Sequence, residues 1–446
     1  MKAMNKILNY LAYFTIVLLF LVVQIFFIDA DVTNLDEFSV EIISCIAIAY
    51  ASVAYLVFAK RYLYLFDALF VLLFPCYYLF SYVFSVYLGF SPFSTSLATA
   101  NEVLFICTSA WFVSVFILLL RPKGVSVQRY FTAFARFQSL AHRSNMSFVF
   151  AFPIAMAVSL FFFSSVASLS FAQLLTSSRL ELISQVGEQG WYLKYLIIAY
   201  AWVLCVYAME FGPRKLLLKA YLLIPLVLYA ISLILVGSRR ELLFIIAFFG
   251  FYYYVKCQGV IQVRFVIIFA CAVLALVSLG VVRAQGDDQI QLYINAFGEF
   301  LFPISTLYYF VENGVKGVGV GESYIQVFLN FVPKNIYPDK PLSLAVQFAE
   351  LVAPPGAQFI MGYAFTPVTE AYVNFGKWAI GVLPLTVLLI SYLSEFIARR
   401  YVFIPIILGA QALNFQRGEF SSFLFEVIML CVCFYFFMLL SRCRFR

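Results

Sequence analysis

The sequence predicts an all-α, polytopic membrane protein of about 12 transmembrane helices, with a long external segment that contains interfacial helices. Of its 446 residues, 64% are hydrophobic and only 11% are charged, and the mean hydropathy is +0.98. A soluble domain could not bury so much apolar surface. Apolar runs of roughly 20 residues, the length of a membrane-crossing helix, recur along the whole chain. These runs are continuous rather than alternating, so they predict helices and not barrel strands.

The apolar runs follow one another closely along the chain. They predict membrane-crossing helices at 7–27, 40–58, 65–87, 102–120, 147–169, 191–210, 219–237, 241–255, 264–282, 377–396, 402–415 and 420–440. The first run lacks a small-residue cleavage site, so it is expected to be a retained helix rather than a signal peptide. The chain is thereby divided into residues 1–282 with the first nine helices, residues 283–376 with the external segment, and residues 377–446 with the last three helices.

The basic residues predict the orientation of these helices. With the N-terminus in the cytoplasm, most of the 29 lysines and arginines fall in short inner loops, where few acidic residues occur. The positive-inside rule then places both termini in the cytoplasm. The basic residues of these loops are Lys2, Lys6, Lys60, Arg61, Arg121, Lys123, Arg129, Arg136, Arg143, Arg214, Lys215, Lys219, Lys256, Arg264, Arg399, Arg400, Arg442, Arg444 and Arg446. Because the charge lies in loops and no nucleic-acid motif is present, no nucleic-acid partner is expected.

The longest predicted loop, residues 283–376, lies on the outer side. Its apolar and aromatic stretches Ile294–Val311 and Tyr324–Val332 predict helices that lie in the membrane interface or re-enter it. The stretch "ENGVKGVGVGES" between them is rich in glycine. Since no strand precedes it, it is predicted to be a flexible turn rather than a phosphate-binding loop.

The residue types available on the outer face limit its chemistry. The single histidine, His142, falls in an inner loop, and the sequence contains no Cys/His cluster or dense acidic group. No metal site and no cofactor are therefore expected. Outer-face chemistry must use carboxylates, arginines and tyrosines.

Arginines recur at the outer ends of the predicted helices, and carboxylates lie near some of them. They occur in "GSRREL" with Arg239, Arg240 and Glu241, in "VVRAQGDD" with Arg283, and in "NFQRGEF" with Arg417 and Glu419, while "FTPVTEAYVNFG" contributes Glu370. An arginine deep in the membrane costs up to ~3 kcal/mol, and guanidinium groups bind phosphate in a bidentate way. This pattern favours a lipid-linked phosphate or pyrophosphate as ligand. Alternatively, the arginines reach lipid headgroups or pair locally, Arg239 or Arg240 with Glu241 and Arg417 with Glu419.

Glu426 lies within the last apolar run, seven residues after Glu419. This spacing is about two helical turns, so both carboxylates are expected on one helix face. A carboxylate at that depth has either a functional role or a local hydrogen bond to a serine or tyrosine of a neighbouring helix.

Four short stretches, "GSRREL", "FVPKNIYPDKP", "PVTEAYVNFG" and "QRGEF", occur in this order on the predicted outer face. In order and side they resemble the O-antigen (Wzy-type) polymerases, also called oligosaccharide repeat unit polymerases. The resemblance covers most of residues 170–425, and the first 160 residues match only as apolar spans. The related O-antigen ligases use an external histidine, which this chain lacks, so the polymerases are favoured.

The resemblance implies a glycosyltransferase of the bacterial inner membrane that acts on the periplasmic face without a cofactor. Such enzymes transfer a growing glycan from undecaprenyl pyrophosphate to a new lipid-linked repeat unit of O-antigen or a related surface polysaccharide. The implied partners are the undecaprenyl-pyrophosphate-linked donor and acceptor, membrane lipid and a chain-length-regulating co-polymerase.

The chemistry of this transfer suggests roles for the outer residues. Arg239, Arg283 and Arg417 are expected to stabilise the charge of the leaving pyrophosphate. Glu370 is the first choice for the base that accepts the acceptor's proton, and Glu419 is the second. The expected substrate-binding residues are Arg240, Arg179, Tyr337 and Lys340, although "YPDKP" is also typical of a rigid turn. Which of Arg239 and Arg240 faces the site stays open.

Two other classes of function fit parts of the sequence. A transporter or flippase of a lipid-linked or anionic substrate would use Glu426 as a coupling carboxylate. A structural membrane scaffold would explain the aromatic spans but not the external arginines. The size of the glycan polymer after mutation separates the three.

Overall fold

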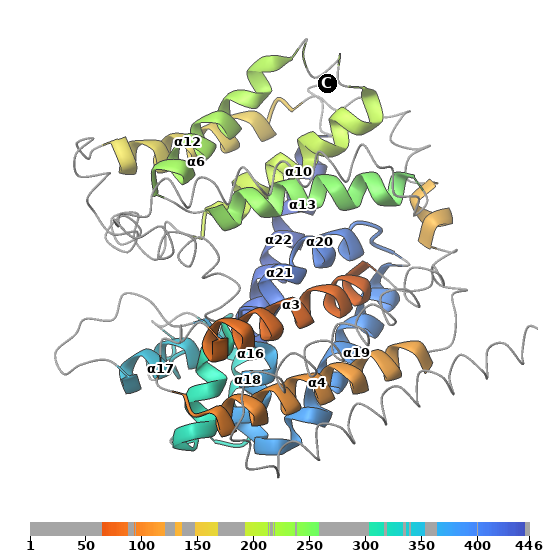
Figure 1. Cartoon of the computed structure of the whole chain (residues 1–446). Coiled ribbons are helices and arrows are strands. Elements are labelled where there is room, and N and C mark those ends of the chain that lie inside the picture. The colour runs from red at the N-terminus through yellow and green to blue at the C-terminus, as the bar shows by residue number, and fades with distance from the viewer. Residues whose placement is uncertain are drawn as a thin grey trace, which may run out of the picture.

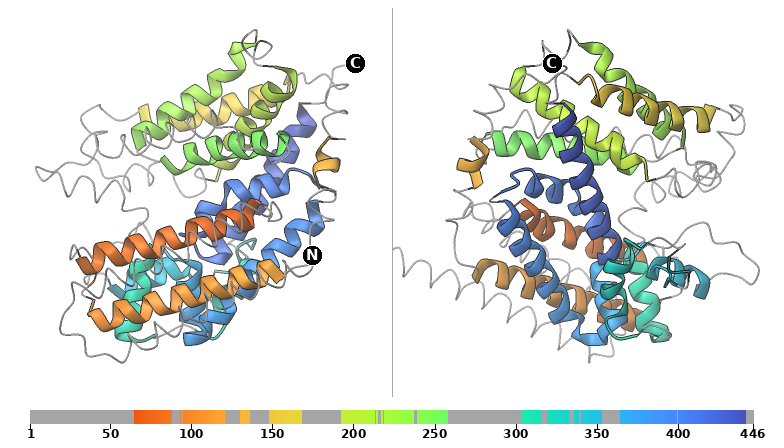
Figure 2. Two further views of the ribbon diagram at one scale, coloured as in Figure 1. Left: turned by 45° about the vertical axis from the view of Figure 1, so that its right-hand side comes forward. Right: turned by 180° about the vertical axis from the view of Figure 1, so that it is seen from behind.

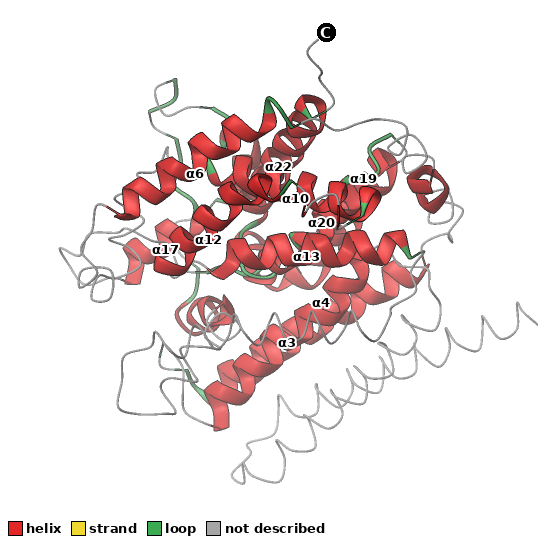
Figure 3. Cartoon of the chain, turned by 90° about the horizontal axis from the view of Figure 1, so that it is seen from above, coloured by secondary structure: helices red, strands yellow, loops and turns green. Residues whose placement is uncertain are grey.

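The computed structural model describes residues 65–87, 93, 95–120, 130–135, 148–167, 192–212, 214, 217, 219–236, 239–257, 303–315, 319–332, 336–338, 340–352, 364–398 and 400–441. Every regular element in these ranges is a helix (Figures 1 and 3). Within these ranges, four helices are long and apolar enough to cross a membrane: Leu97–Leu118, Lys194–Phe211, Pro367–Ala398 and Phe420–Leu440. The chain is thus a helical membrane protein, and the expected total of about 12 spans stays a prediction.

The helices are labelled as in Figure 1. As far as Lys256, the labelled helices of the described residues are α3 (Leu65–Tyr87), α4 (Leu97–Leu120), α6 (Ala151–Ala167), α10 (Lys194–Phe211), η1 (Ala220–Leu223), α12 (Ile224–Val236) and α13 (Arg239–Lys256). The others are α16 (Glu322–Leu329), α17 (Leu344–Val352), α18 (Pro367–Phe375), η2 (Gly376–Trp378), α19 (Ala379–Ala398), α20 (Ile404–Ala410), α21 (Ala412–Phe415) and α22 (Phe420–Leu440). Residues 130–135 and 303–313 are also helical.

Two groups of helices pack on opposite sides of α20, α21 and α22 (Figures 1 and 2). The first group contains α3, α4, α16, α18 and α19, and the second contains α6, α10, α12 and α13. The short helix α20 contributes Leu408 to the core of the first group and Ile407 to the core of the second. Helix α22 begins against the first group with Phe423 and ends against the second with Phe437. These central helices therefore join the two groups.

Aromatic packing holds α10 against α13 in the second group. Trp202 is fully buried and stacks on Phe248 with ring centroids 4.6 Å apart. Its indole N–H donates to the backbone oxygen of Phe244 at 3.3 Å. The stack and the hydrogen bond fix the two helices relative to each other.

We expect the Trp202→Ala variant to lose about 3–5 kcal/mol of unfolding free energy, because the substitution leaves a cavity that the neighbouring rings cannot fill. Thermal unfolding of the purified protein in detergent measures this loss. Phe436→Ala is the control, because Phe436 is 42% exposed on α22. Equal losses in the two variants would contradict a special role for the Trp202 stack.

The predicted span 402–415 is not one continuous helix. The chain forms α20 and α21 instead, with the break at Gln411. Even if unbroken, the stretch from Ile404 to Phe415 would extend only about 18 Å, less than the ~30 Å thickness of the hydrocarbon core. This stretch does not cross lipid because it carries polar amide side chains. Gln411, Asn414 and Gln416 are buried inside the protein and do not face lipid.

The tenth predicted span starts earlier than expected. Thr366 caps the N-terminus of α18 by accepting a hydrogen bond from the Thr369 N–H at 3.2 Å, and Pro367 follows as the first helical residue. Gly376 ends α18 with a φ of 60°, a backbone conformation that favours glycine. The chain then continues through η2 into α19, so the candidate span runs from Pro367 to Ala398 rather than starting at residue 377.

Ion pairs near the helix ends join residues that the predicted topology places on the same side of the membrane. Lys377 Nζ lies 2.8 Å from Glu102 Oε1, and both residues belong to the predicted outer side. Lys256 Nζ lies 3.3 Å from Glu210 Oε1, and both belong to the predicted inner side. The contacts are consistent with the expected helix directions, and the orientation in a membrane stays a prediction.

Candidate functional site

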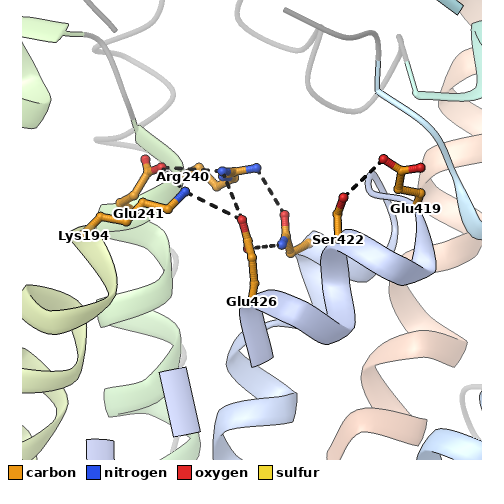
Figure 4. A network of polar contacts seen from close by, with 7 residues as sticks. Lys194, Arg240, Glu241, Glu419, Ser422 and Glu426 are labelled. Atoms are coloured by element: carbon orange, nitrogen blue, oxygen red, sulfur yellow. Dashed lines mark hydrogen bonds and ion pairs between the residues drawn. The ribbon is translucent and has the colours of Figure 1, made fainter. Parts of the chain in front are cut away.

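A cluster of charged side chains forms where the N-terminal ends of α10, α13 and α22 meet (Figure 4). It consists of Lys194, the first residue of α10; Arg240 and Glu241, in the first turn of α13; and Glu426, in the second turn of α22. We call these four residues the charge cluster. Asn414 of α21 contacts its edge.

Each cation of the charge cluster lies between the same two carboxylates. Lys194 Nζ is 3.6 Å from Glu426 Oε1 and 3.8 Å from Glu241 Oε1. Arg240 Nη2 is 3.6 Å from Glu241 Oε1 and 3.7 Å from Glu426 Oε1. Arg240 Nη1 also donates to Asn414 Oδ1 at 3.3 Å, and the Asn414 amide nitrogen donates to Glu426 Oε2.

The members of the charge cluster differ in their exposure. Lys194 and Glu241 are buried, whereas the Arg240 side chain is 26% exposed. Buried charges are stable only when they are paired, and two cations here face two carboxylates. Arg240 is therefore the cation of this cluster that a ligand can approach.

The local helix ends make this region favourable for an anion. The N-terminus of a helix carries a partial positive charge, so the first turn favours carboxylates and disfavours lysine and arginine. Glu241 follows this rule at the start of α13, but Lys194 and Arg240 oppose it. The two cations and two carboxylates of the charge cluster balance each other, so an incoming phosphate would meet the partial positive charge of three helix ends and the exposed part of Arg240.

A second polar group joins α18 to α22 through Glu370, which is fully buried. Ser323 Oγ donates to Glu370 Oε1 at 2.6 Å, and the backbone N–H of Phe420 donates to Glu370 Oε2 at 2.5 Å. Asn374 Nδ2 donates to Ser323 Oγ at 2.8 Å. Because Phe420 is the first residue of α22, Glu370 satisfies a backbone donor at the start of that helix.

Glu419 makes the corresponding contact to the next element. The backbone N–H of Leu344, the first residue of α17, donates to Glu419 Oε2 at 2.9 Å. Ser422 Oγ donates to Glu419 Oε1 at 3.2 Å (Figure 4). Glu370 therefore ties α18 to α22, and Glu419 ties α22 to α17. The structure thus brings together the two carboxylates that the sequence suggested as alternative bases.

The Glu419 carboxylate lies just before α22. Burial raises its pKa above the ordinary value for glutamate, although hydrogen bonds from Leu344 and Ser422 act in the opposite direction. Between the ordinary and the raised value, the unfolded chain releases this proton while the folded chain keeps it. The stability contributed by Glu419 is therefore present below the ordinary pKa and is lost as the pH rises through the raised pKa.

We expect the wild type to lose thermal stability relative to Glu419→Gln as the pH rises from about 4. The glutamine variant keeps a neutral side chain at every pH, so it corrects for other titrating groups. Thermal unfolding of both proteins in detergent across this range measures the difference. A wild type that gains stability relative to the variant would contradict a raised pKa.

The structure describes two of the other predicted arginines, Arg239 and Arg417. Arg239 is the first residue of α13, next to the charge cluster. Arg417 is partly exposed in the turn between α21 and α22, and its backbone N–H donates to the Asn414 oxygen at 3.2 Å. Arg179 and Arg283 lie outside the described residues.

The stretch "YPDKP" contains a turn. The backbone N–H of Lys340 donates to the Tyr337 oxygen at 3.3 Å, which closes a four-residue turn. The Tyr337 side chain is 40% exposed and Lys340 is partly exposed. The turn interpretation therefore describes the backbone here, and substrate binding by these two residues stays a prediction.

Two alternatives that the sequence left open can be compared with the contacts. Arg240 does pair locally with Glu241. Glu426 was expected either to have a functional role or to bond a serine or tyrosine. It contacts the Tyr195 hydroxyl of the neighbouring helix α10, and it also forms ion pairs with Lys194 and Arg240. No role was predicted from the sequence for Lys194 or Asn414. A signal for both existed, because each is a polar residue next to or within an apolar run.

Buried polar side chains flank α21 in the sequence. Both polar side-chain atoms of Gln411 and Gln416, and the hydroxyl of Ser421, have no hydrogen-bond partner among the described residues. All three residues are fully buried. Since native proteins leave few such atoms unsatisfied, ordered water or a polar ligand is expected next to them.

The described residues offer cations, carboxylates and amides, and among them no group of three or more His, Cys, Asp or Glu side chains is placed to hold a metal ion. No protein-family model, curated protein or solved structure matches this chain. Its function must therefore be inferred from its own residues and contacts.

Proposed function

We propose that this chain is a glycosyltransferase of the bacterial inner membrane that joins undecaprenyl-pyrophosphate-linked oligosaccharide repeat units into O-antigen or a related surface polysaccharide. The observation that supports this most is the position of Arg240. It lies partly exposed at the N-terminal ends of α10, α13 and α22, and the Glu370–Glu419 pair lies at the start of α22. The periplasmic face is proposed for this side of the helices.

Arg240 and the helix N-termini around it suit the donor. As the bond between the sugar C1 and the pyrophosphate oxygen breaks, negative charge grows on the lipid pyrophosphate. Once the pyrophosphate is bound, a guanidinium and helix N-termini at this place stabilise the growing charge without further rearrangement. We assign this role first to Arg240, with Arg239, Arg283 and Arg417 as further candidates.

The acceptor hydroxyl needs a base within about 3 Å. Glu419 accepts from Leu344 and Ser422 at 2.9 and 3.2 Å, whereas the contacts of Glu370 are 2.6 and 2.5 Å long, so Glu419 is held less tightly. Glu370 is fully buried, and both of its oxygens bind donors that hold helices in place. These contacts favour Glu419 as base and Glu370 as the residue that positions it, which reverses the order expected from the sequence. One carboxylate suffices for a single inverting displacement.

The external helices offer a contact for the lipid. Ile325 and Phe328 of α16 are 63% and 75% exposed, as expected for a helix in the membrane interface. Ser323, on the same helix, reaches Glu370. A lipid-linked substrate in the interface would therefore lie near the Glu370–Glu419 pair. A chain-length-regulating co-polymerase remains a proposed partner.

One observation favours the transporter or flippase alternative. Lys194 and Glu241 are buried in helices, and buried ion pairs are common in transporters. The charge cluster, however, lies at one end of its helices rather than midway along them.

Glycans from cells that lack the gene, with and without the wild-type gene restored, test the proposal. Loss of the polymer ladder with a single repeat unit retained on the surface lipid is the expected result. Loss of even the single unit would indicate transport instead. An unchanged ladder would exclude the proposed function.

A further inference from the structure

Arg240 is held by charge but only loosely by hydrogen bonds. Its Nη2 lies 3.6 and 3.7 Å from two carboxylate oxygens, whereas charge-assisted hydrogen bonds are about 2.7–2.9 Å long. Its Nε has no hydrogen-bond partner among the described residues. The guanidinium therefore keeps donors that an oxyanion with closer geometry would satisfy.

The two carboxylates beside Arg240 are not equivalent. Glu241 follows Arg240 in the same helical turn and is fully buried. Glu426 comes from α22, its side chain is 13% exposed, and it also contacts Lys194 and Asn414. If Arg240 moves away, Glu426 still has a cation and an amide donor.

We propose that Glu426 competes with the substrate's pyrophosphate for binding to Arg240. On binding, the pyrophosphate takes Arg240 from Glu426, while Lys194 and Asn414 hold the Glu426 carboxylate and keep it paired. Because Glu426 stays paired, the exchange avoids the cost of an unpaired carboxylate inside the protein. The identity of the ligand rests on the proposed function. The inference makes Lys194, Asn414 and Glu426 positioning residues for Arg240.

The proposal predicts opposite signs for neighbouring substitutions. Glu426→Gln removes the competing charge but keeps the shape, so it strengthens pyrophosphate binding. Lys194→Met leaves Glu426 with Arg240 as its remaining cation in the charge cluster, so it weakens binding. General damage to the site would weaken binding in both variants, and thus the sign separates exchange from damage.

Titration of the purified full-length protein in detergent with farnesyl pyrophosphate, and separately with inorganic pyrophosphate, measures the effect. We expect Glu426→Gln to bind more tightly by on the order of tenfold. In the Arg240→Ala background the same substitution should change nothing. Glu350→Gln is the matched control, because it removes the same charge from an exposed position on α17 and should leave affinity unchanged.

An affinity of Glu426→Gln equal to or below that of the wild type would overturn the proposal. Tightening with farnesyl pyrophosphate alone supports it and assigns the ligand to lipid, whereas tightening with both ligands supports recognition of the charged group itself. If Glu426→Gln does not fold, Glu426→Ala replaces it. This variant also removes the competing carboxylate from Arg240, so binding should tighten, and unchanged or weaker binding would overturn the proposal.

The binding test is independent of the proposed function. If Glu426→Gln tightens pyrophosphate binding but cells without the gene keep their polymer, the exchange stands and the glycosyltransferase proposal fails. If the polymer disappears with the gene but Glu426→Gln leaves affinity unchanged, the glycosyltransferase proposal stands and the exchange fails.

Discussion

Cells that carry Arg240→Ala as their only copy are expected to show a single repeat unit in place of the polymer ladder, with the variant present in the membrane. Loss of one donor that stabilises transition-state charge costs about 10²–10³ in rate, enough to stop repeated addition. Lys194 continues to pair with Glu241 and Glu426 after the change, so the helices stay packed. Gel analysis of the glycan and a blot of the membrane fraction measure both quantities.

Two further variants sharpen the Arg240 test. Arg240→Lys keeps the charge but loses the planar fork that matches phosphate, so it should retain short polymers. Arg400→Ala removes an arginine on the predicted inner side, and it should leave the ladder unchanged. A full ladder in Arg240→Ala at normal membrane levels would show that Arg240 has no part in the reaction.

Glu370→Ala is expected to destabilise the protein severely. The substitution leaves the Phe420 N–H and the Ser323 hydroxyl without their buried acceptor, and each unsatisfied buried group costs about 1–3 kcal/mol. The contacts from α18 to α16 and α22 would weaken together. Low membrane levels, and a lower unfolding temperature in detergent, are the expected measurements.

The Glu370→Gln variant tests whether Glu370 positions its neighbours or accepts the proton of the acceptor hydroxyl. The glutamine oxygen can still accept from Phe420, and the Ser323 hydroxyl can turn to accept from the new amide. A positioning residue therefore keeps most activity in this variant, whereas a general base loses it at normal protein levels. We expect the first result for Glu370 and the second for Glu419→Gln. The reverse pattern would restore Glu370 as base.

The sequence predicted the long helices well because their signal is local. The expected spans 65–87 and 420–440 coincide with α3 and α22, since each is a long apolar run between polar residues. The span 402–415 was wrong as a continuous helix, because hydropathy counts apolar residues but does not register buried amides such as Gln411. The earlier start at Pro367 follows from the cap at Thr366, which has a sequence signal of its own.

The candidate site could be predicted only in part. Arg240 and Glu241 adjoin in the sequence, so their pairing was one of two alternatives that local spacing allowed. The contacts of Lys194 with Glu426, and of Glu419 with Leu344, join distant parts of the chain. Their partners depend on how α10, α17 and α22 pack, which one sequence does not specify.

The most direct test of the proposed function uses the purified chain in lipid vesicles, supplied with an undecaprenyl-pyrophosphate-linked repeat unit as both donor and acceptor. The proposal predicts products of two or more repeat units and release of undecaprenyl pyrophosphate, with neither formed by the Arg240→Ala variant. Movement of unextended substrate across the vesicle membrane, without any longer product, would contradict it.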